Sequence, residues 1–279
     1  MSNTNTVTLL EGDNLDFLKS FASDTYDLIV VDPPYGIGKT FQSHSGSFDD
    51  KKKGSEFIQW MRPRLVEAKR VLKDNGSFFI FGDYREIHYL KVELDDIFGR
   101  KSFQNEIIWN YDYGGRSKSK WSAKHDTILW YSKDPKKYTF NYNVIDRIPY
   151  LAPGLVGPEK AAKGKTPTDV WWQTIVPTNG KERLGWPTQK PIALFNRIIK
   201  VHSNPGDQVL DFFAGSGTTG DAAQSNGRNV TLIDSNPSAI TLIKKRLCLT
   251  TPSITANNNP QPEKEEETTP SLILDPIQK

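Results

Sequence analysis

The chain has 279 residues, of which 36 % are hydrophobic and 25 % are charged, and its formal net charge is +3. This composition is typical of a globular protein with one large domain, and no apolar run approaches the roughly 18 residues that a membrane span needs. Cys248 is the single cysteine, which excludes an internal disulfide, and the first residues lack the pattern of a secretory signal. We therefore expect a cytoplasmic protein.

Apolar runs and helical patterns alternate along the first half of the chain. Short strands are predicted at residues 7–10, 26–31, 77–81, 107–109 and 127–131. The apolar spacing of residues 57–72 predicts a helix that stops at Asn75-Gly76 and that Pro63 would kink. Two polar, Gly- and Ser-rich stretches, 39–53 and 114–124, lack periodicity and are predicted to be loops.

The regular alternation stops over residues 132–185, which are rich in Lys, Pro, Gly and Tyr and predict an irregular insert. It resumes with two predicted helices, 191–202 and 219–226, and two predicted strands, 208–213 and 229–233. Residues 250–279 have the composition of a disordered tail. Strands that alternate with helices predict an α/β fold with a doubly wound, mostly parallel sheet.

The charge is unevenly distributed. Residues 100–200 contain 18 Lys and Arg against 8 Asp and Glu, whereas residues 251–279 contain 2 basic and 5 acidic residues. A basic region of this size suits a polyanionic partner, and a solvated surface explains it equally well on charge alone.

The stretch DFFAGSGTTG suggests a cofactor loop. Gly215, Gly217 and Gly220 satisfy the spacing G-x-G-x-x-G, and Asp234 ends the next predicted strand, where an acidic residue would bond ribose hydroxyls. Asp211 lies four residues before the first glycine, where a carboxylate would repel a pyrophosphate but could accept from an ammonium group. S-adenosylmethionine, which has an ammonium group and a ribose but no phosphate, fits this pattern better than a dinucleotide.

The stretch Asp32-Pro33-Pro34-Tyr35 follows a predicted buried strand. The exocyclic amino group of a nucleobase is a poor nucleophile, because its lone pair is delocalised into the ring. The Asp32 carboxylate and the Pro33 carbonyl can accept its two hydrogens, and the fixed φ of proline holds that carbonyl in place. Tyr35 offers a face on which a flipped base can stack. The structural alternative is an X-Pro turn with Tyr35 packed on the core.

Taken together, these motifs resemble those of the amino-directed DNA methyltransferases over residues 7–246. VDPPYG resembles the catalytic motif of that family and LDFFAGSGTT its cofactor loop. The catalytic motif precedes the cofactor loop, a circularly permuted order that resembles the β class. The resemblance implies a Rossmann-like methyltransferase fold, double-stranded DNA as the partner, a homodimer as a common state, and a role in restriction–modification.

The resemblance also implies roles for individual residues. Asp32, Pro33, Pro34 and Tyr35 would be catalytic. WPTQKP and LLEGDNLDFL resemble two further cofactor segments, so the set expected to bind S-adenosylmethionine is Asp13, Asp32, Thr188, Lys190, Asp211, Phe212, Phe213, Ala214, Gly215, Gly217, Thr218 and Asp234. KHDTILWYSK resembles a segment in which His125 would lie near the target base. Asp126 and Asp234 stand where the family usually has Glu.

A division of the chain follows from this reading. Residues 1–132 form the catalytic half, 133–185 a target-recognition insert, 186–249 the cofactor half and 250–279 the disordered tail. Lys118, Lys120 and Lys124 of the basic loop are expected to contact DNA. Four aromatic residues in or beside the insert either stack on bases or fill a small core: Tyr131, Tyr138, Trp171 and Trp172. The histidines show no spacing typical of a metal site, so no metal is expected.

We therefore expect transfer of a methyl group to an exocyclic amino group in DNA. In the resembling family an Asp at the first motif position accompanies adenine and Ser accompanies cytosine, which favours adenine. A cytosine amino methyltransferase and an enzyme acting on RNA remain alternatives. A non-catalytic DNA-binding module is a rival that the intact Asp32 and glycine loop disfavour. A nicotinamide oxidoreductase would leave Asp-Pro-Pro-Tyr and the basic insert unexplained.

Overall fold

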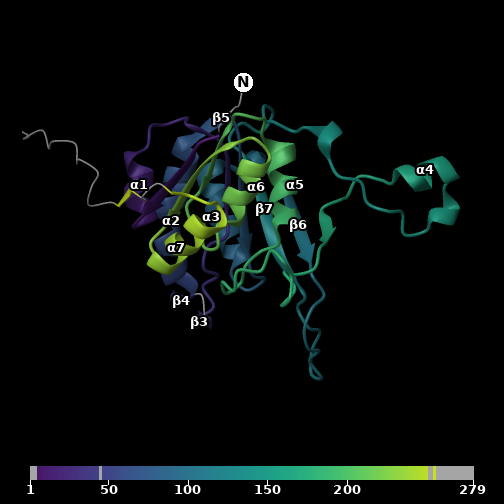
Figure 1. Ribbon diagram of the computed structural model, residues 1–279, viewed down its shortest axis with the longest axis horizontal. Helices are drawn as coiled ribbons and strands as arrows, with labels where there is room; N and C mark the ends of the chain where they lie inside the picture. Colours follow the sequence, from purple (N-terminus) through teal and green to yellow (C-terminus); the bar gives the residue numbers. More distant parts are fainter. Residues whose placement is uncertain (1–4, 44–45, 251–253, 256–279) are drawn as a thin grey trace, which may run out of the picture.

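The structure is a computed structural model that describes residues 5–43, 46–250 and 254–255. Nine strands form one sheet with helices on both faces (Figure 1). Across the sheet the order is β11 (Ile254–Thr255), β1 (Val7–Glu11), β10 (Asn229–Asp234), β9 (Gln208–Asp211), β2 (Tyr26–Val31), β5 (Leu72–Gly82), β7 (His125–Ser132), β6 (Phe103–Asn110) and β8 (Val170–Trp172). The first six strands pair in parallel, β7 pairs antiparallel with β5 and β6, and β8 is parallel to β6.

Alternate side chains of the central strands face opposite helical layers, because successive residues of a strand point to opposite faces. Leu28 and Val30 of β2 belong to the core under one layer, and Ile29 and Val31 to the core under the other. One layer consists of α5 (Ile192–His202), α6 (Thr218–Ser225) and α7 (Pro237–Arg246), and the other of α1 (Asn14–Ser20), α2 (Gly54–Val71) and α3 (Ile87–Phe98). The predicted doubly wound α/β fold is confirmed.

Residues 39–53 are not a loop, and that prediction was wrong. They contain an antiparallel hairpin of β3 (Lys39–Ser43) and β4 (Gly46–Asp50), which forms a separate two-stranded sheet. Its strands are rich in Lys, Ser, Gln and Asp, so they lack the alternating apolar pattern by which a half-buried strand is recognised. Backbone pairing holds the hairpin, and this pairing leaves no periodic signal in the sequence.

The junction between α2 and β5 also differs from the prediction. The helix runs without interruption through Pro63, and β5 begins at Leu72, directly after the helix ends. Asn75 and Gly76 therefore lie within the strand and do not stop the helix. The pairing of β5 with β2 shifts register here, because Tyr26 pairs with Leu72 and Leu28 pairs with Ser77. β5 therefore has extra residues between these two pairs, and Asn75 and Gly76 are among them. The turn-forming dipeptide marks an irregularity inside the strand, not the end of the helix.

The insert is largely irregular, as predicted. It contains two single-turn 3-10 helices, Tyr142–Val144 and Pro153–Leu155, and the short helix α4 (Pro158–Lys163), which lies on an arm that projects from the body (Figure 1). Near its base, Asp146 pairs with Arg197 of α5 at 2.6 Å. The strand β8 joins the central sheet, so this part of the insert is continuous with the fold.

The predicted tail lies mostly outside the described residues. Its described segment, Ile254–Thr255, pairs with Leu10 and Glu11 of β1 as the edge strand β11. Among the described helices, none combines the length and the apolar character that crossing a membrane requires.

Candidate active site

The two motifs meet because their strands are neighbours in the sheet. Asp32 directly follows β2, and Asp211 ends β9, which pairs in parallel with β2. Parallel strands place their carboxyl ends at one edge, where ligands bind in open α/β sheets. A cavity of about 790 Å³ opens at this edge. Its volume lies within the range of sites that take cofactor-sized ligands.

Nearly all of the predicted catalytic and cofactor residues line this cavity. They are Asp13, Asp32, Pro33, Pro34, Tyr35, Thr188, Lys190, Asp211, Phe212, Phe213, Ala214, Gly215, Thr218 and Asp234. Gly217 is not among the lining residues. The sequence did not single out the aromatic wall that Phe57 and Trp60 of α2 contribute, because a helical apolar stripe is indistinguishable from ordinary core.

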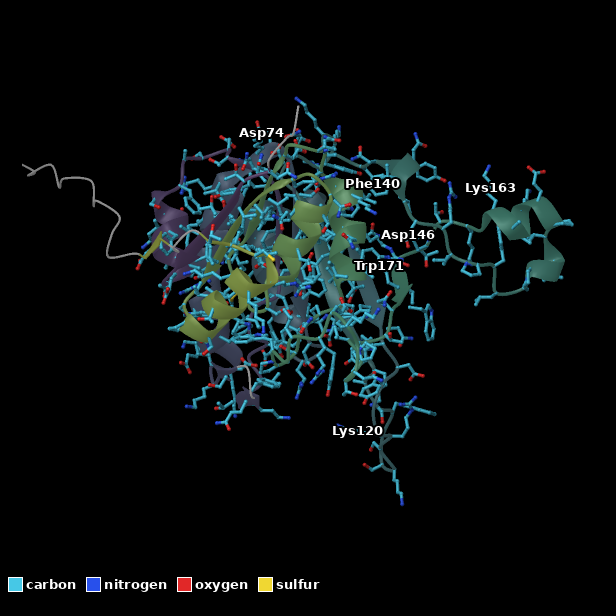
Figure 2. All side chains as sticks on the ribbon, viewed as in Figure 1. Asp74, Lys120, Phe140, Asp146, Lys163 and Trp171 are labelled. Atoms are coloured by element: carbon cyan, nitrogen blue, oxygen red, sulfur yellow. The ribbon has the colours of Figure 1, made fainter. Side chains whose placement is uncertain are left out.

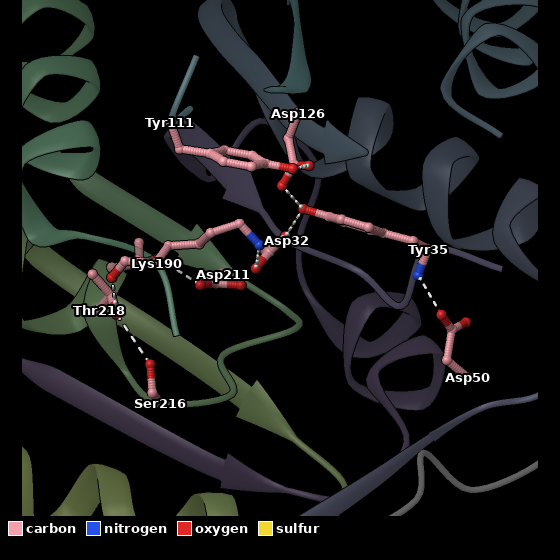
Figure 3. Close-up of polar contacts among 10 residues, drawn as sticks. Asp32, Tyr35, Asp50, Tyr111, Asp126, Lys190, Asp211, Ser216 and Thr218 are labelled. Atoms are coloured by element: carbon pink, nitrogen blue, oxygen red, sulfur yellow. Dashed lines mark hydrogen bonds and ion pairs between the residues drawn. The ribbon is translucent and has the colours of Figure 1, made fainter. Parts of the chain in front are cut away.

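Asp32 is held by two side chains from distant parts of the chain (Figure 3). The Lys190 ammonium donates to Oδ1 at 2.9 Å and to Oδ2 at 2.7 Å, and the Tyr35 hydroxyl lies 2.9 Å from Oδ1. The side chain of Lys190 is 5 % exposed and that of Asp32 is 20 % exposed. The resemblance suggested Lys190 as a cofactor ligand, whereas in the structure its ammonium pairs with the Asp32 carboxylate.

Asp126 links the motif to the strand β7. Its Oδ2 accepts from the Tyr35 hydroxyl at 3.1 Å, and its Oδ1 lies 3.4 Å from the Tyr111 hydroxyl. Burial raises the pKa of Asp126, Lys190 opposes that shift, and the neighbouring Asp32 adds to it. Burial, together with Asp126 and Asp32, also raises the pKa of Tyr35 well above its usual value. Tyr35 is therefore a neutral hydroxyl placed between two carboxylates.

Asp211 and Asp234 are the carboxylates best suited to a cationic ligand. Asp211 accepts from the Thr219 hydroxyl at 2.5 Å and from the Phe213 amide at 2.9 Å, and Asp234 accepts from the Gly215 amide at 2.8 Å. Neither carboxylate forms an ion pair with another described residue. Burial raises the pKa of Asp234 and raises that of Asp211 to about 7. Such a pair fits an ammonium group and a ribose, and disfavours a pyrophosphate.

Asp13 has a structural partner as well as a place in the cavity wall. It caps α1 by accepting from the Leu15 amide at 2.8 Å, and it pairs with Arg64 of α2 at 2.9 Å. Its side chain remains 54 % exposed, so it stays accessible to a ligand.

Gly217 is required by the backbone conformation and the core packing, and it does not line the cavity. Its φ is +74°, and a Cβ there would lie 3.0 Å from Cγ1 of Ile243 in the core. We expect Gly217→Val to lower the free energy of unfolding by about 1–3 kcal/mol through backbone strain. Urea unfolding measures this loss, with Gly217→Ala as a milder control. A variant of native stability that fails to bind cofactor would contradict this assignment.

Asp50 is a positioning residue that the sequence did not reveal. It is 2 % exposed and accepts from three successive backbone amides, those of Tyr35, Gly36 and Ile37, at 3.2, 2.7 and 3.3 Å. It lies at the end of β4, inside the stretch predicted to be a loop. A carboxylate that binds a run of amides fixes the backbone that presents Tyr35.

We expect Asp50→Ala to lower kcat by about 10²-fold, because a misplacement of about 1 Å in a catalytic group has effects of that size. Asp50→Asn keeps one acceptor oxygen and should fall between this variant and the wild type. Steady-state kinetics at saturating cofactor measure the effect. An unchanged kcat in Asp50→Ala would show that the hairpin does not position Tyr35.

The predicted DNA contacts lie outside this cavity. Lys118 and Lys120 are exposed on the loop between β6 and β7, which projects from the body with Lys120 near its tip (Figure 2). Lys124 and His125 line a second cavity at the base of the loop. Of the four aromatic residues considered for base stacking, Tyr131 and Trp171 are buried, Tyr138 packs against the core, and Trp172 is 71 % exposed.

The profile of the DNA methylase family (N6_N4_Mtase) matches residues 26–245, which is most of the chain and includes both motifs. The chain belongs to this DNA methylase family. The expected resemblance is thereby confirmed, and S-adenosylmethionine is the methyl donor of this methylase.

Two relatives are 36 % identical to this DNA methylase. The type II methyltransferase M.HpaI of Haemophilus parainfluenzae aligns over 230 residues, 82 % of this chain and 70 % of its own. The DNA adenine methyltransferase YhdJ of Escherichia coli aligns over 253 residues, 86 % of this chain and 82 % of its own.

Solved structures agree with the fold. The M1.HpyAVI–SAM complex superposes with a TM-score of 0.61 at 25 % identity, covering 88 % of this chain and all of that one. The cytosine-N4-specific PvuII methyltransferase gives a TM-score of 0.67 at 18 % identity, with 90 % and 89 % of the two chains covered. At that identity the likeness shows a shared fold.

In the described part of the methylase, no cluster of three or more His, Cys, Asp or Glu side chains could hold a metal ion.

Proposed function

We propose that this DNA methylase transfers a methyl group from S-adenosylmethionine to the exocyclic amino group of adenine at specific sites in double-stranded DNA. The observation that carries the proposal is the shared cavity, which joins the Asp-Pro-Pro-Tyr motif to the glycine loop. Asp at position 32 favours adenine over cytosine by resemblance. The relative YhdJ, an adenine methyltransferase by name, supports the same choice.

Asp32 and the Pro33 carbonyl would accept the two hydrogens of the adenine amino group. Oδ1 of Asp32 already has two partners, Lys190 and Tyr35, whereas Oδ2 has Lys190 alone. A carboxylate oxygen offers about two lone-pair sites, so Oδ2 retains one for the substrate. Acceptance of both hydrogens localises the lone pair on the amino nitrogen. S-adenosylmethionine, when bound, supplies the methyl group that this nitrogen attacks.

Lys190 would hold the Asp32 carboxylate in its orientation. The ammonium is nearly buried, and it also lies 4.9 Å from the centre of the Tyr35 ring. Tyr35 is fixed through its hydroxyl by Asp32 and Asp126 and through its backbone by Asp50. A ring held at both ends is a rigid platform for a base rotated out of the duplex.

The cofactor would be bound by the acidic residues of the other strand ends. We assign the ammonium to Asp211 and the ribose hydroxyls to Asp234, because both are buried carboxylates without a basic partner among the described residues. Asp13, whose exposed side chain lines the same cavity, is assigned to the adenine end.

Cofactor binding should release a proton near neutral pH. Burial raises the pKa of Asp211 to about 7, and an ammonium binds the carboxylate but not the neutral acid, so binding lowers that pKa. The dissociation constant should therefore rise about tenfold per pH unit below pH 7. Titration calorimetry in two buffers of different ionisation enthalpy counts the released proton. Asp211→Asn should bind weakly at pH 8 and show no such slope. A wild-type affinity that is constant between pH 5.5 and 8 would contradict the assignment.

DNA would approach over the basic loop and the insert. We assign phosphate contacts to Lys118, Lys120 and Lys124, proximity to the target base to His125, and recognition of the target sequence to residues 133–185. A cytoplasmic location and a homodimer stay predictions of the sequence.

Methylation of unmodified DNA by the purified protein with methyl-labelled S-adenosylmethionine tests the function. Nucleoside analysis should find the label in N6-methyladenine, with Asp32→Asn as the inactive control. Label in N4-methylcytosine would assign the cytosine reaction, and label in RNA alone would change the substrate. Binding of DNA without any label would favour the non-catalytic module.

A further inference from the structure

The loop that joins β6 to β7 continues their antiparallel ladder beyond the sheet. The last paired residues are Asn110 and His125, and beyond them the amides of Tyr111 and Asp112 donate to the Lys124 carbonyl at 3.1 and 3.3 Å. Arg116 pairs with Asp112 at 2.6 Å. The loop is therefore anchored at its base while its tip projects into solvent (Figure 2).

Two tryptophans beside this loop are exposed. Trp121 is 100 % exposed and Trp172 is 71 % exposed, whereas the other tryptophans are buried or partly buried. Trp171 and Trp172 are successive residues of β8, and the first packs in the core while the second points outward. Exposed indole rings are unfavourable in a free protein, so a pair of them indicates a binding surface.

Both indoles line the second cavity, which has a volume of about 430 Å³ and shares no lining residue with the catalytic cavity. Arg116, Lys124 and His125 line it too, and Asp112 is its sole acidic residue. Lys118 and Lys120 extend the positive charge along the loop. Indole faces surrounded by lysine and arginine suit a nucleobase with its phosphate better than an apolar peptide.

The second cavity and the catalytic network lie at neighbouring pairs of one ladder. Asn110 and His125 line the cavity, and the preceding pair is Trp109 with Asp126, whose carboxylate accepts from Tyr35. Successive residues of a strand point to opposite faces, so the second cavity and the Asp126 carboxylate lie on opposite faces of this edge of the sheet. A nucleotide in the second cavity would therefore be a different one from the target base.

We propose that the cavity walled by Trp121 and Trp172 takes one unpaired nucleotide of the opened duplex, with its base stacked on the indoles and its phosphate against Lys124 and Arg116. This inference rests on the proposed action on DNA. Removal of the target adenine from the helix leaves its partner base on the other strand unpaired, and this site would stabilise the opened duplex.

The test uses a short duplex with one bulged 2-aminopurine nucleotide and the same duplex fully paired. The wild type should bind the bulged duplex about 5- to 150-fold more tightly, the range that stacking of one base on an aromatic ring provides. Its binding should also quench the 2-aminopurine fluorescence. Trp121→Ala and Trp172→Ala should each lose most of this preference, and Trp121→Phe should keep part of it.

Two controls separate this site from the catalytic cavity and from general surface effects. Tyr35→Ala removes the catalytic platform and should keep the preference, and Tyr89→Ala removes a 62 % exposed ring on α3 and should change nothing. If Tyr35→Ala loses the preference while Trp121→Ala keeps it, the bulged base enters the catalytic cavity and the proposal is wrong. Equal binding of both duplexes by the wild type overturns it too.

The same measurement keeps the two proposals apart, because the bulge preference requires no methyl transfer. The expected preference in a protein that fails to methylate DNA would reject the proposed function and support the nucleotide site.

Discussion

Replacing Asp32 with alanine will lower kcat by about 10³-fold and leave S-adenosylmethionine binding largely intact. In the proposed reaction the carboxylate accepts an amino hydrogen as the new bond forms, so its contribution would be made in the transition state, and losses of this size are typical for such groups. Asp32→Asn should also be nearly inactive, because the amide has lost the charge. Single-turnover methylation measures the first effect and calorimetric titration of the cofactor measures the second.

The same replacement should destabilise the protein, and this effect has to be separated from catalysis. Lys190 has a 5 % exposed side chain and lies 2.7 Å from Asp32, so Asp32→Ala leaves a nearly buried ammonium without its partner. Loss of one partner of such a pair costs about 3 kcal/mol or more. A double variant, Asp32→Ala with Lys190→Met, should recover much of that stability.

The double variant makes the prediction decisive. It should fold like the wild type and still fail to methylate, which assigns the lost activity to chemistry and not to unfolding. Near-native turnover in a folded Asp32→Ala protein would sink the catalytic assignment.

Charge-removing changes at Lys118, Lys120 and Lys124 will weaken binding to all DNA sequences alike. The log of the affinity falls linearly with the log of the salt concentration, by about 0.9 for each phosphate that the protein neutralises. Replacement of all three lysines by glutamine should therefore flatten the slope by about three units. Fluorescence anisotropy at several salt concentrations gives the slope.

A second triple variant, which loses the same charge at other places, provides the control. It replaces three exposed lysines that lie away from the loop: Lys19 on α1, Lys101 just before β6 and Lys245 on α7. Their replacement should change the slope much less. If the loop variant keeps the wild-type slope, its lysines are a solvated surface and this loop does not face DNA.

The sequence by itself determined the fold class, because the α/β alternation rests on local patterns. Buried parallel strands are continuous apolar runs, such as residues 26–31, and helices such as α5 show an apolar stripe with helical spacing. The two motifs could also be recognised from the sequence, because the glycine loop and Asp-Pro-Pro-Tyr are each one continuous stretch of the chain. Each motif can therefore be recognised by its own residues, and the order of the two resembles that of the permuted β class.

Tertiary structure alone decided which side chains act together. Lys190 lies 158 positions from its partner Asp32, and Asp126 lies 91 positions from Tyr35. The hairpin that carries Asp50 and the second cavity with Trp121 and Trp172 left no periodic pattern. The local sequence predicts the secondary structure of a segment and which of its faces is buried. Contacts between groups far apart in the chain depend on strand order and register, and these are set when the whole sheet packs.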